Sequence, residues 1–257
     1  MAPIRGLIQS IWSSVSRWST GLHVRVLGEP VRGRCVLFVS NHVSYLDIPV
    51  LSGELEASFV AKTEVSSWPL FGLIAKLTNT VFVNRTSRDA AAQRQELSQR
   101  LEQGESLILF PEGTSTDGST VAPFKSSLFS VVHHAAGAGQ TAIIQPISIT
   151  YVRTIDGTPL VGSRRSLYCW FGDDTFFPHL MRVLSLKGVE VELRFHPPLS
   201  IGEKPDRKDL ARRAHAIVSA GNAAAQGQLA ADAPEDCVNE APPVIFDAKD
   251  QAEPAYR

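Results

Sequence analysis

The sequence predicts an α/β fold in which a single mixed sheet is flanked by helices and preceded by an amphipathic N-terminal helix. Three observations lead to this prediction. Short runs of β-branched and aromatic residues alternate with stretches of helical character between residues 35 and 225. Residues 4–22 repeat apolar side chains at three- and four-residue steps. The chain has 257 residues, 44% of them hydrophobic, which is enough for one substantial core.

Strand-like and helix-like segments follow one another along the chain. The strand-like runs occupy residues 36–39, 58–61, 80–84, 107–110, 142–151, 167–171 and 189–195. The helix-like stretches lie at residues 47–51, 68–77, 88–103, 124–136, 179–186 and 206–225. Ser87 and Asp206 can cap the helices that follow them, because their side-chain oxygens accept bonds from free backbone N–H groups. Such alternation is typical of a sheet covered by helices on both faces.

Residues 1–34 are expected to form an amphipathic segment at a membrane surface. On a helix that turns about 100° per residue, the apolar side chains fall on one face and the polar ones on the other. The apolar set is Ile4, Leu7, Ile8, Ile11, Trp12, Val15, Trp18 and Leu22. The segment holds five arginines and one acid, a net charge of +4, which suits anionic lipids. A helix packed on the domain's own core is the open alternative.

The remainder of the chain divides into residues 35–225, the expected catalytic domain, and residues 226–257, an expected disordered tail. From Asp232 onward the tail holds seven acids and two bases, a net charge of -5. No run reaches the roughly 18 apolar residues of a membrane-spanning helix. Three cysteines (Cys35, Cys169 and Cys237) lie far apart without metal-ligand spacing, so we expect reduced thiols in a cytosolic setting and no metal site. No nucleic-acid-binding motif is present, and we expect no such partner.

His42 and Asp47 are the first candidate catalytic residues along the chain. They follow the apolar run 36–39 and are five residues apart, so in a continuous helix they would point about 140° away from each other. They can meet if His42 lies in a turn and Asp47 begins a short helix, whose first turn tolerates Pro49. The carboxylate would then accept a proton from one imidazole nitrogen and leave the other nitrogen free as a general base. By itself, this spacing equally fits a loop histidine with a capping aspartate.

Two further strings follow expected strands, and a third lies within one. Residues 110–115, Phe-Pro-Glu-Gly-Thr-Ser, put a carboxylate and a flexible glycine at the end of the run 107–110, where backbone N–H groups can approach a ligand closely. Arg85 follows the run 80–84 and can hold a phosphate or carboxylate through two hydrogen bonds. Pro146 interrupts an apolar strand, which indicates an edge or a bulge beside a cavity. Taken singly, residues 110–115 could be no more than a strand-ending turn, and Arg85 could equally be a surface arginine.

In this order, the strings resemble the motifs of the glycerolipid acyltransferase family, which includes the 1-acylglycerol-3-phosphate acyltransferases. The matching residues are Asn41-His42-(x4)-Asp47, Phe82-Val83-Asn84-Arg85, Phe110-Pro111-Glu112-Gly113-Thr114 and the region of Pro146. The resemblance implies that His42 is the general base and Asp47 its orienting partner. It also implies acceptor-headgroup contacts by Arg85, Glu112, Gly113 and Thr114, a tunnel-wall position for Pro146, and a cation for phosphate or a developing oxyanion at Lys62.

One departure from the family pattern bears on the acceptor. Phosphatidate-forming members usually have an arginine after Glu-Gly-Thr, and this chain has Ser115. The continuation through residues 116–129 looks most like bacterial lyso-ornithine lipid acyltransferases, which favours an aminolipid acceptor without excluding lysophosphatidate. Lys125 could supply part of the missing positive charge, and an ordinary surface lysine is the alternative.

The resemblance implies an O-acyltransferase without a cofactor. It would move a fatty acyl group from an acyl carrier protein or coenzyme A thioester to the hydroxyl of a lysolipid, with no acyl-enzyme. We expect a peripheral or monotopic protein on the cytoplasmic face of the inner membrane. A thioesterase that uses the same His–Asp pair with water as acceptor, and a non-catalytic lysolipid-binding protein, remain the alternatives.

Overall fold

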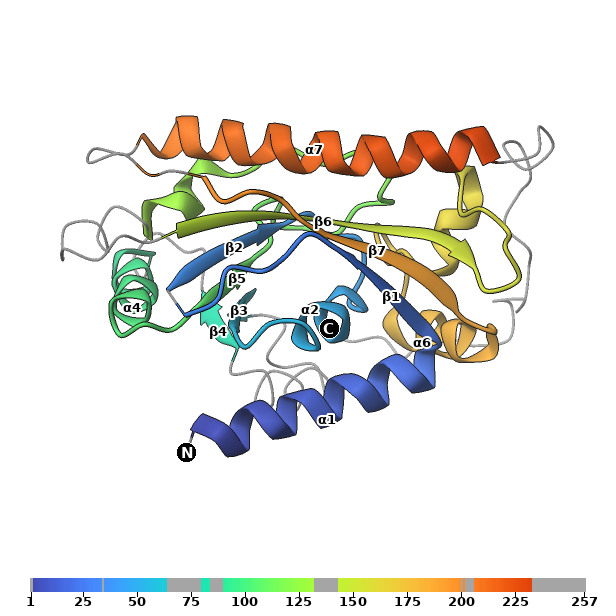
Figure 1. The fold of residues 1–257 in the computed structure, drawn as a ribbon, viewed down its shortest axis with the longest axis horizontal. Coiled ribbons are helices and arrows are strands. Elements are labelled where there is room, and N and C mark those ends of the chain that lie inside the picture. Colours follow the sequence, from blue (N-terminus) through green and yellow to red (C-terminus); the bar gives the residue numbers. More distant parts are fainter. Residues whose placement is uncertain are drawn as a thin grey trace, which may run out of the picture.

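Seven strands of the described chain form one mixed sheet in the order β1-β7-β6-β2-β5-β3-β4 in a computed structural model (Figure 1). The structure describes residues 2–33, 35–63, 80–83, 90–131, 143–199, 201 and 206–232. The strands are β1 (Leu22–Leu27), β2 (Val36–Ser40), β3 (Ser58–Lys62), β4 (Val81–Val83), β5 (Leu107–Leu109), β6 (Ile143–Thr154) and β7 (Val189–Phe195). Among these strands β6 and β7 pair antiparallel, and the other pairs are parallel. The predicted fold class is confirmed.

Helices cover both faces of the sheet, so that β2 and β5 are buried throughout. The helices are α1 (Ala2–Thr20), α2 (Asp47–Ser52), α4 (Ala90–Glu102), α6 (Phe176–Ser185) and α7 (Arg207–Asp232), with 3-10 helices η2 (Ser126–Ser130) and η3 (Gly162–Leu167). One core cluster joins α2 and α6 to the sheet, and a second joins α4, η2 and α7. Figure 1 shows α7 along one side of the sheet and α1 on the opposite side, beyond α2.

Several predicted elements are corrected by the structure. Residues 22–27, placed in the membrane segment, form the edge strand β1, because Leu22 and Val24 pack into the core against β7. The predicted strand at 167–171 is the end of η3 and a strandless stretch. The predicted helix at 124–136 begins as the short η2, and its residues from 132 lie outside the described chain. The predicted helix at 68–77 also lies outside the described residues.

The last helix extends beyond its predicted end. α7 continues to Asp232, so the boundary expected at residue 226 is wrong. The extension, Gln-Gly-Gln-Leu-Ala-Ala-Asp, contains mostly residues of good helix propensity (Gln, Leu and Ala), and Pro234 stands just past its end. Asn222 and Ala225 are buried on the face of α7 that packs on β6. The remainder of the expected tail lies outside the described residues.

α1 packs on the domain through its polar face. Ser13 Oγ donates to the carbonyl of Pro49 (2.7 Å), and the Arg17 guanidinium donates to the carbonyls of Pro49 and Val50. These acceptors belong to α2, whose last turn has carbonyls without partners inside the helix. The apolar face of α1 is therefore turned outward, with the large exposed fractions Leu7 61%, Ile8 44%, Ile11 55%, Val15 57% and Trp18 84%. No helix in the described part of the chain is long and apolar enough to span a bilayer.

Candidate active site

The end of β2 is fixed in position by Asn41. Its side-chain amide donates to the carbonyl of Ile149 (2.9 Å), and its side-chain oxygen accepts the N–H of the same residue (2.8 Å). This two-way bond replaces a rung of the β2–β6 ladder just after their last strand pair, Ser40 with Ile147. The chain can then leave the sheet directly at His42 without unpaired backbone groups on the neighbouring strand.

The side chains of His42 and Asp47 meet across a turn that leads into a short helix, as predicted. His42 lies in the turn after β2, Asp47 begins α2, and His42 Nδ1 lies 2.8 Å from Asp47 Oδ2. A carboxylate only accepts hydrogen bonds, so Nδ1 carries the proton and Nε2 presents a lone pair. The His42 side chain keeps 21% of its surface exposed, whereas that of Asp47 is fully buried. One imidazole nitrogen is therefore held by the protein and the other is available for chemistry.

Asp47 is surrounded by donors. Oδ2 accepts the backbone N–H groups of Val43 (2.8 Å) and Ser44 (3.1 Å) besides the imidazole, and Oδ1 accepts the hydroxyl of Tyr151 (3.0 Å). Burial and the neighbouring carboxylate raise the pKa of Tyr151 well above its usual value, so the phenol keeps the proton that it donates. Four donors on two oxygens orient the carboxylate and compensate for its removal from water.

The second predicted string lies against the first. The Phe110 ring stacks on the imidazole of His42 with centroids 4.2 Å apart and planes inclined by 20°. The Thr116 N–H donates to the His42 carbonyl (3.0 Å), and the His42 N–H donates to Glu112 Oε1 (2.6 Å). The histidine is thus held at its ring face, its amide and its carbonyl by a single loop, residues 110–116.

Glu112 is an internal support of this loop. Its second oxygen, Oε2, accepts the N–H of Ala122 (2.7 Å), so each carboxylate oxygen has a backbone donor. Burial raises the pKa of Glu112 to about 7, and the N–H donors of His42 and Ala122 oppose that rise. The next residue, Gly113, has φ of 74°, a left-handed conformation that favours glycine, and its N–H bonds back to the Phe110 carbonyl (3.1 Å). The carboxylate thus faces the protein interior, and its predicted headgroup contact stays a prediction.

The remaining predicted residues are placed less completely. Lys62 ends β3, at the sheet edge where β2 and β5 also end, while the placement of its side chain and of Arg85 lies outside the description. Thr114 and Lys125 are exposed on the loop after β5. The described geometry therefore brings together His42, Asp47 and Glu112.

Pro146 lies in an interior strand, which corrects the predicted edge position. β6 pairs with β2 on one side and β7 on the other. The proline is tolerated because the ladder with β7 ends at Ile147, where β7 runs out after Phe195. The carbonyl of Pro146 accepts the N–H of His196, the first residue beyond β7. Pro146 itself is buried, and its predicted tunnel-wall position stays a prediction.

Tyr151 was missed in the sequence interpretation. The two-residue period of β6 places it on the same face as Ile147 and Ile149, and all three side chains join the core cluster that contains α2. A buried tyrosine needs a hydrogen-bond partner for its hydroxyl, so a tyrosine in this apolar strand already indicated a buried acceptor nearby. Its partner is 104 positions away in the sequence, so only the folded chain identifies Asp47 as the acceptor.

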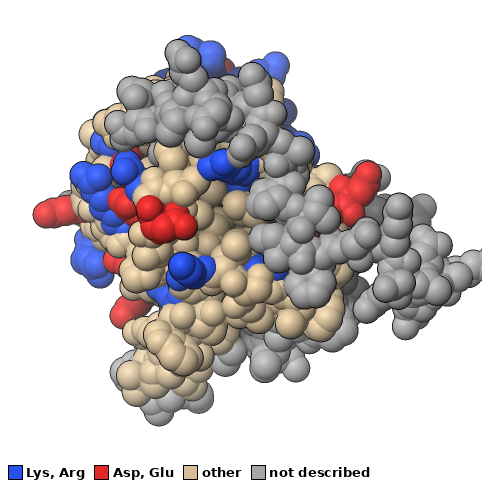
Figure 2. Space-filling view, turned by 90° about the vertical axis from the view of Figure 1, so that its right-hand side faces the viewer, with Lys and Arg blue, Asp and Glu red and all other residues tan. Residues whose placement is uncertain are grey.

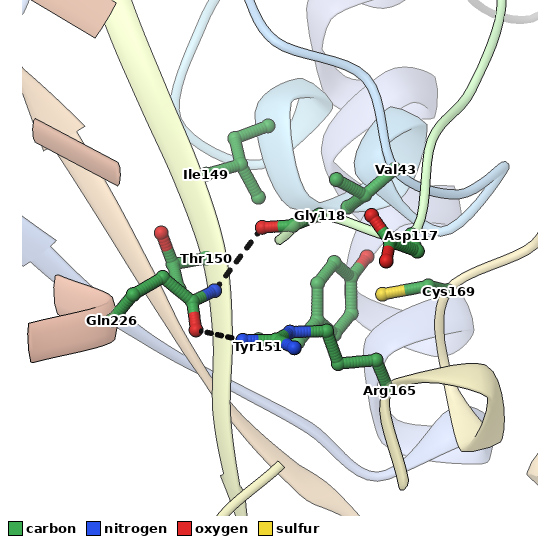
Figure 3. A pocket seen from close by; sticks show the side chains of 9 residues that line it. All are labelled: Val43, Asp117, Gly118, Ile149, Thr150, Tyr151, Arg165, Cys169 and Gln226. Carbon is green, nitrogen blue, oxygen red and sulfur yellow. Dashed lines mark hydrogen bonds between the residues drawn. The ribbon is translucent and has the colours of Figure 1, made fainter. Parts of the chain in front are cut away.

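A small cavity lies behind the His42–Asp47 turn (Figure 3). Its volume of about 10 Å³ is close to the smallest that holds one water molecule, far too small for a fatty acyl chain. Gln226 of α7 crosses it, donating to the Gly118 carbonyl (3.1 Å) and accepting from Arg165 (2.6 Å). Cys169 is on its wall, where burial raises the pKa of the thiol well above its usual value. These contacts tie α7 to the loop that supports His42.

Comparisons with known proteins identify the family and agree with the fold. A family model described as Acyltransferase matches residues 23–150, which include His42, Asp47 and Glu112. A lyso-ornithine lipid O-acyltransferase of Brucella abortus is 42% identical over 196 residues, 75% of this chain and 73% of that protein. A 1-acyl-sn-glycerol-3-phosphate acyltransferase of Neisseria gonorrhoeae is 32% identical over 173 residues, 67% of this chain and 63% of that protein.

A solved structure has the same fold. The crystal structure of the 1-acyl-sn-glycerophosphate acyltransferase from Thermotoga maritima matches with a TM-score of 0.62 and 22% identity, over 87% of this chain and 80% of that one. The family model and these relatives together identify an acyltransferase. The chain belongs to the acyltransferase family, as its sequence had indicated.

Proposed function

We propose that the protein transfers a fatty acyl group from a thioester carrier to the hydroxyl of a lysolipid. The acceptor is lyso-ornithine lipid, 1-acyl-sn-glycerol-3-phosphate or both, following the names of the relatives that match over most of their length. The observation that carries the proposal is the His42–Asp47 pair, in which Nδ1 is engaged and Nε2 presents a lone pair. Either acyl carrier protein or coenzyme A serves as the donor carrier.

The mechanism follows from the orientation of the imidazole. Nε2 removes the proton from the acceptor hydroxyl while the hydroxyl oxygen bonds to the thioester carbonyl carbon. The carbonyl electron pair moves to oxygen and then returns, which expels the carrier thiolate, and the thiolate takes the proton from the imidazolium. Asp47 stabilises that imidazolium, and Glu112 holds the backbone from which His42 projects. No acyl-enzyme forms, because the acceptor itself is the nucleophile.

The other predicted residues are assigned to the two substrates and to the transition state. Arg85 and Lys125 would contact its headgroup, together with backbone groups at Gly113 and Thr114. Lys62, at the same sheet edge as His42, would stabilise the oxyanion. A positioned oxyanion donor is typically worth about 3 kcal/mol of transition-state stabilisation. Pro146 would line the path of the acyl chain.

The proposed location is the cytoplasmic face of the inner membrane, with α1 in the bilayer interface. The outward apolar face of α1 supports its position in the interface, since Leu7, Ile11 and Trp18 are each more than half exposed. Serine at these three positions should release the full chain from vesicles of phosphatidylethanolamine and phosphatidylglycerol. Ser10→Ala and Ser14→Ala, at exposed polar positions of the same helix, provide the matched control. Unchanged flotation of the apolar-face variant would contradict the anchor.

A panel of acceptors and donors tests the activity. The purified full chain is incubated with lyso-ornithine lipid, lysophosphatidate or no acceptor, each with acyl carrier protein and coenzyme A thioesters, and products are identified by mass spectrometry. We expect an acylated lysolipid in the wild type and none with His42→Ala. Free fatty acid formed at the same rate with and without acceptor would identify a thioesterase instead. Lysolipid binding without turnover of any thioester would identify a non-catalytic binding protein.

A further inference from the structure

α6 has an exposed apolar face of its own. Phe177, Met181 and Leu184 are exposed by 67%, 46% and 44%, and their spacing of four and three residues places them on one side of the helix. The one charged residue of α6, Arg182, is turned away from this side. Its guanidinium donates to Asp174 Oδ2 (3.0 Å) and to the Ser166 carbonyl (3.0 Å). The outer side of α6 therefore presents apolar surface without a charge.

The inner side of α6 packs on the turn that holds the candidate base. His179 is fully buried, and its Nδ1 lies 3.0 Å from the hydroxyl of Tyr45. The Phe176 ring meets the Tyr45 ring edge-on, with centroids 4.9 Å apart. Tyr45 lies between His42 and Asp47 in the sequence, two residues before the aspartate. α6 thus packs over the His42–Asp47 turn, and its apolar side faces outward.

The exposed sides of α6 and α1 point away from the same face of the sheet. Both helices lie on the side of the core cluster that contains α2, and they contact each other. Figure 1 shows α6 beside the C-terminal end of α1. In Figure 2 the lower part of the surface, at the height of α1, carries few charged side chains, whereas charges gather above it. The two apolar stripes are therefore neighbours on a side of the molecule that carries few charges among the residues that Figure 2 colours.

We propose that α6 is a second bilayer-contacting helix, and that α1 and α6 together form the membrane-binding side of the protein. The inference rests on the proposed membrane location of α1 and extends it to α6. We assign this surface to the lipid interface for two reasons. It consists of two neighbouring helices whose outward sides are apolar, and α1 carries the Trp18 side chain, which is 84% exposed. Exposed indoles on amphipathic helices favour the boundary between lipid headgroups and acyl chains. Such contact places the His42–Asp47 turn next to the bilayer that holds the lysolipid.

The test compares vesicle binding of three forms of the full chain. The α6 variant is Phe177→Ser, Met181→Ser and Leu184→Ser. The matched control is Ala216→Ser, Ala220→Ser and Ala223→Ser, which also places three serines on an exposed helix side, on α7 across the sheet. Flotation with phosphatidylethanolamine–phosphatidylglycerol vesicles gives the partition coefficient. We expect the α6 variant to partition at least about tenfold more weakly than the wild type and the control to be unchanged.

Other readouts separate this inference from its alternatives. Thermal unfolding shows whether the α6 variant is folded, and if it is not, Phe177→Ser alone is measured in its place. Equal partition of the folded α6 variant and the wild type overturns the proposal. So does light scattering that shows a wild-type dimer which the α6 variant converts to a monomer, because the stripe would then be a contact between copies. Flotation needs no turnover, so failure of the proposed acyl transfer is seen separately in the acceptor panel.

Discussion

Replacing Asp47 with asparagine should remove a charge from the candidate site while preserving its geometry. Oδ2 accepts three N–H groups, from the imidazole and from the backbone of Val43 and Ser44. Asparagine must place its carbonyl oxygen at that position, since its NH2 group would face three donors there. The NH2 group then occupies the Oδ1 position and can donate to the hydroxyl oxygen of Tyr151. The His42 tautomer is kept, and only the negative charge is lost.

The lost charge weakens stabilisation of the imidazolium formed during proton transfer. With Nδ1 and Oδ2 2.8 Å apart, the two charge centres are separated by about 4 Å. At an effective dielectric constant of about 20, their attraction is about 4 kcal/mol, or roughly a thousandfold in rate. We expect kcat to fall by about this factor with KM little changed, since Asp47 is buried and does not reach the substrate.

Steady-state acyl transfer to a lysolipid measures this effect, with thermal unfolding as the control for the fold. Asp47→Ala removes all four contacts as well as the charge, so it should lower the unfolding temperature, unlike the asparagine variant. An Asp47→Asn enzyme within tenfold of the wild-type kcat would refute the reasoning, because the charge would then have no part in the rate-limiting step. The two kcat values are therefore compared at a temperature at which thermal unfolding shows both the wild type and the asparagine variant to be folded.

Three further substitutions test the surroundings of this pair. His42→Ala should lower kcat by at least about a thousandfold, because a positioned general base contributes up to about four orders of magnitude, while flotation and unfolding temperature stay at wild-type values. Tyr151→Phe removes one hydroxyl donor from the Asp47 carboxylate and should lower kcat by roughly tenfold at constant KM, measured with the same assay. Glu112→Gln should change how stability depends on pH. Burial raises the folded-state pKa of Glu112 from 4.5 to about 7, so the folded protein binds this proton more tightly than the unfolded chain does. Its contribution to the free energy of unfolding therefore decreases as pH rises from about 4.5 to 7, by at most about 3 kcal/mol. Urea unfolding at pH 5 and pH 8 should show a smaller decrease in the glutamine variant, and identical decreases would contradict the assigned burial.

The central part of the site could be predicted because it depends on local chain geometry. His42 follows a run of buried residues and Asp47 precedes a short helical stretch, so a turn between them brings the side chains together. The loop at 110–116 was likewise predicted at the end of a strand. Its contact with His42 required the additional fact that β2 and β5 are parallel neighbours, which places their ends at one edge. Tyr151 could not be paired with Asp47 in this way, because β6 reaches the site through long-range packing.

The amphipathic pattern of α1 could be predicted, but the direction in which it packs could not. Periodicity establishes that a helix has an apolar side and a polar side, and burial of the apolar side is the ordinary outcome. Here the polar side faces the protein, because Gln9, Ser13 and Arg17 find backbone acceptors on and after α2. These acceptors are main-chain carbonyls, which have no signature in the sequence. The same limit applies to β1, whose pairing with β7 depends on a partner more than 160 residues away.

The packing of α1 has a consequence for the Asp47 carboxylate. A helix as short as α2 is not stable by itself, since too few of its backbone groups pair internally. Its first turn is fixed by the donors around Asp47, and its last carbonyls are fixed by Ser13 and Arg17 of α1. Arg17 also forms an ion pair with Glu54 (2.9 Å), just beyond the end of α2. The helix proposed to contact lipid therefore also supports the helix that orients the imidazole. Removing α1 would disturb Asp47 together with membrane binding, so only substitutions on its outward side can separate the two roles.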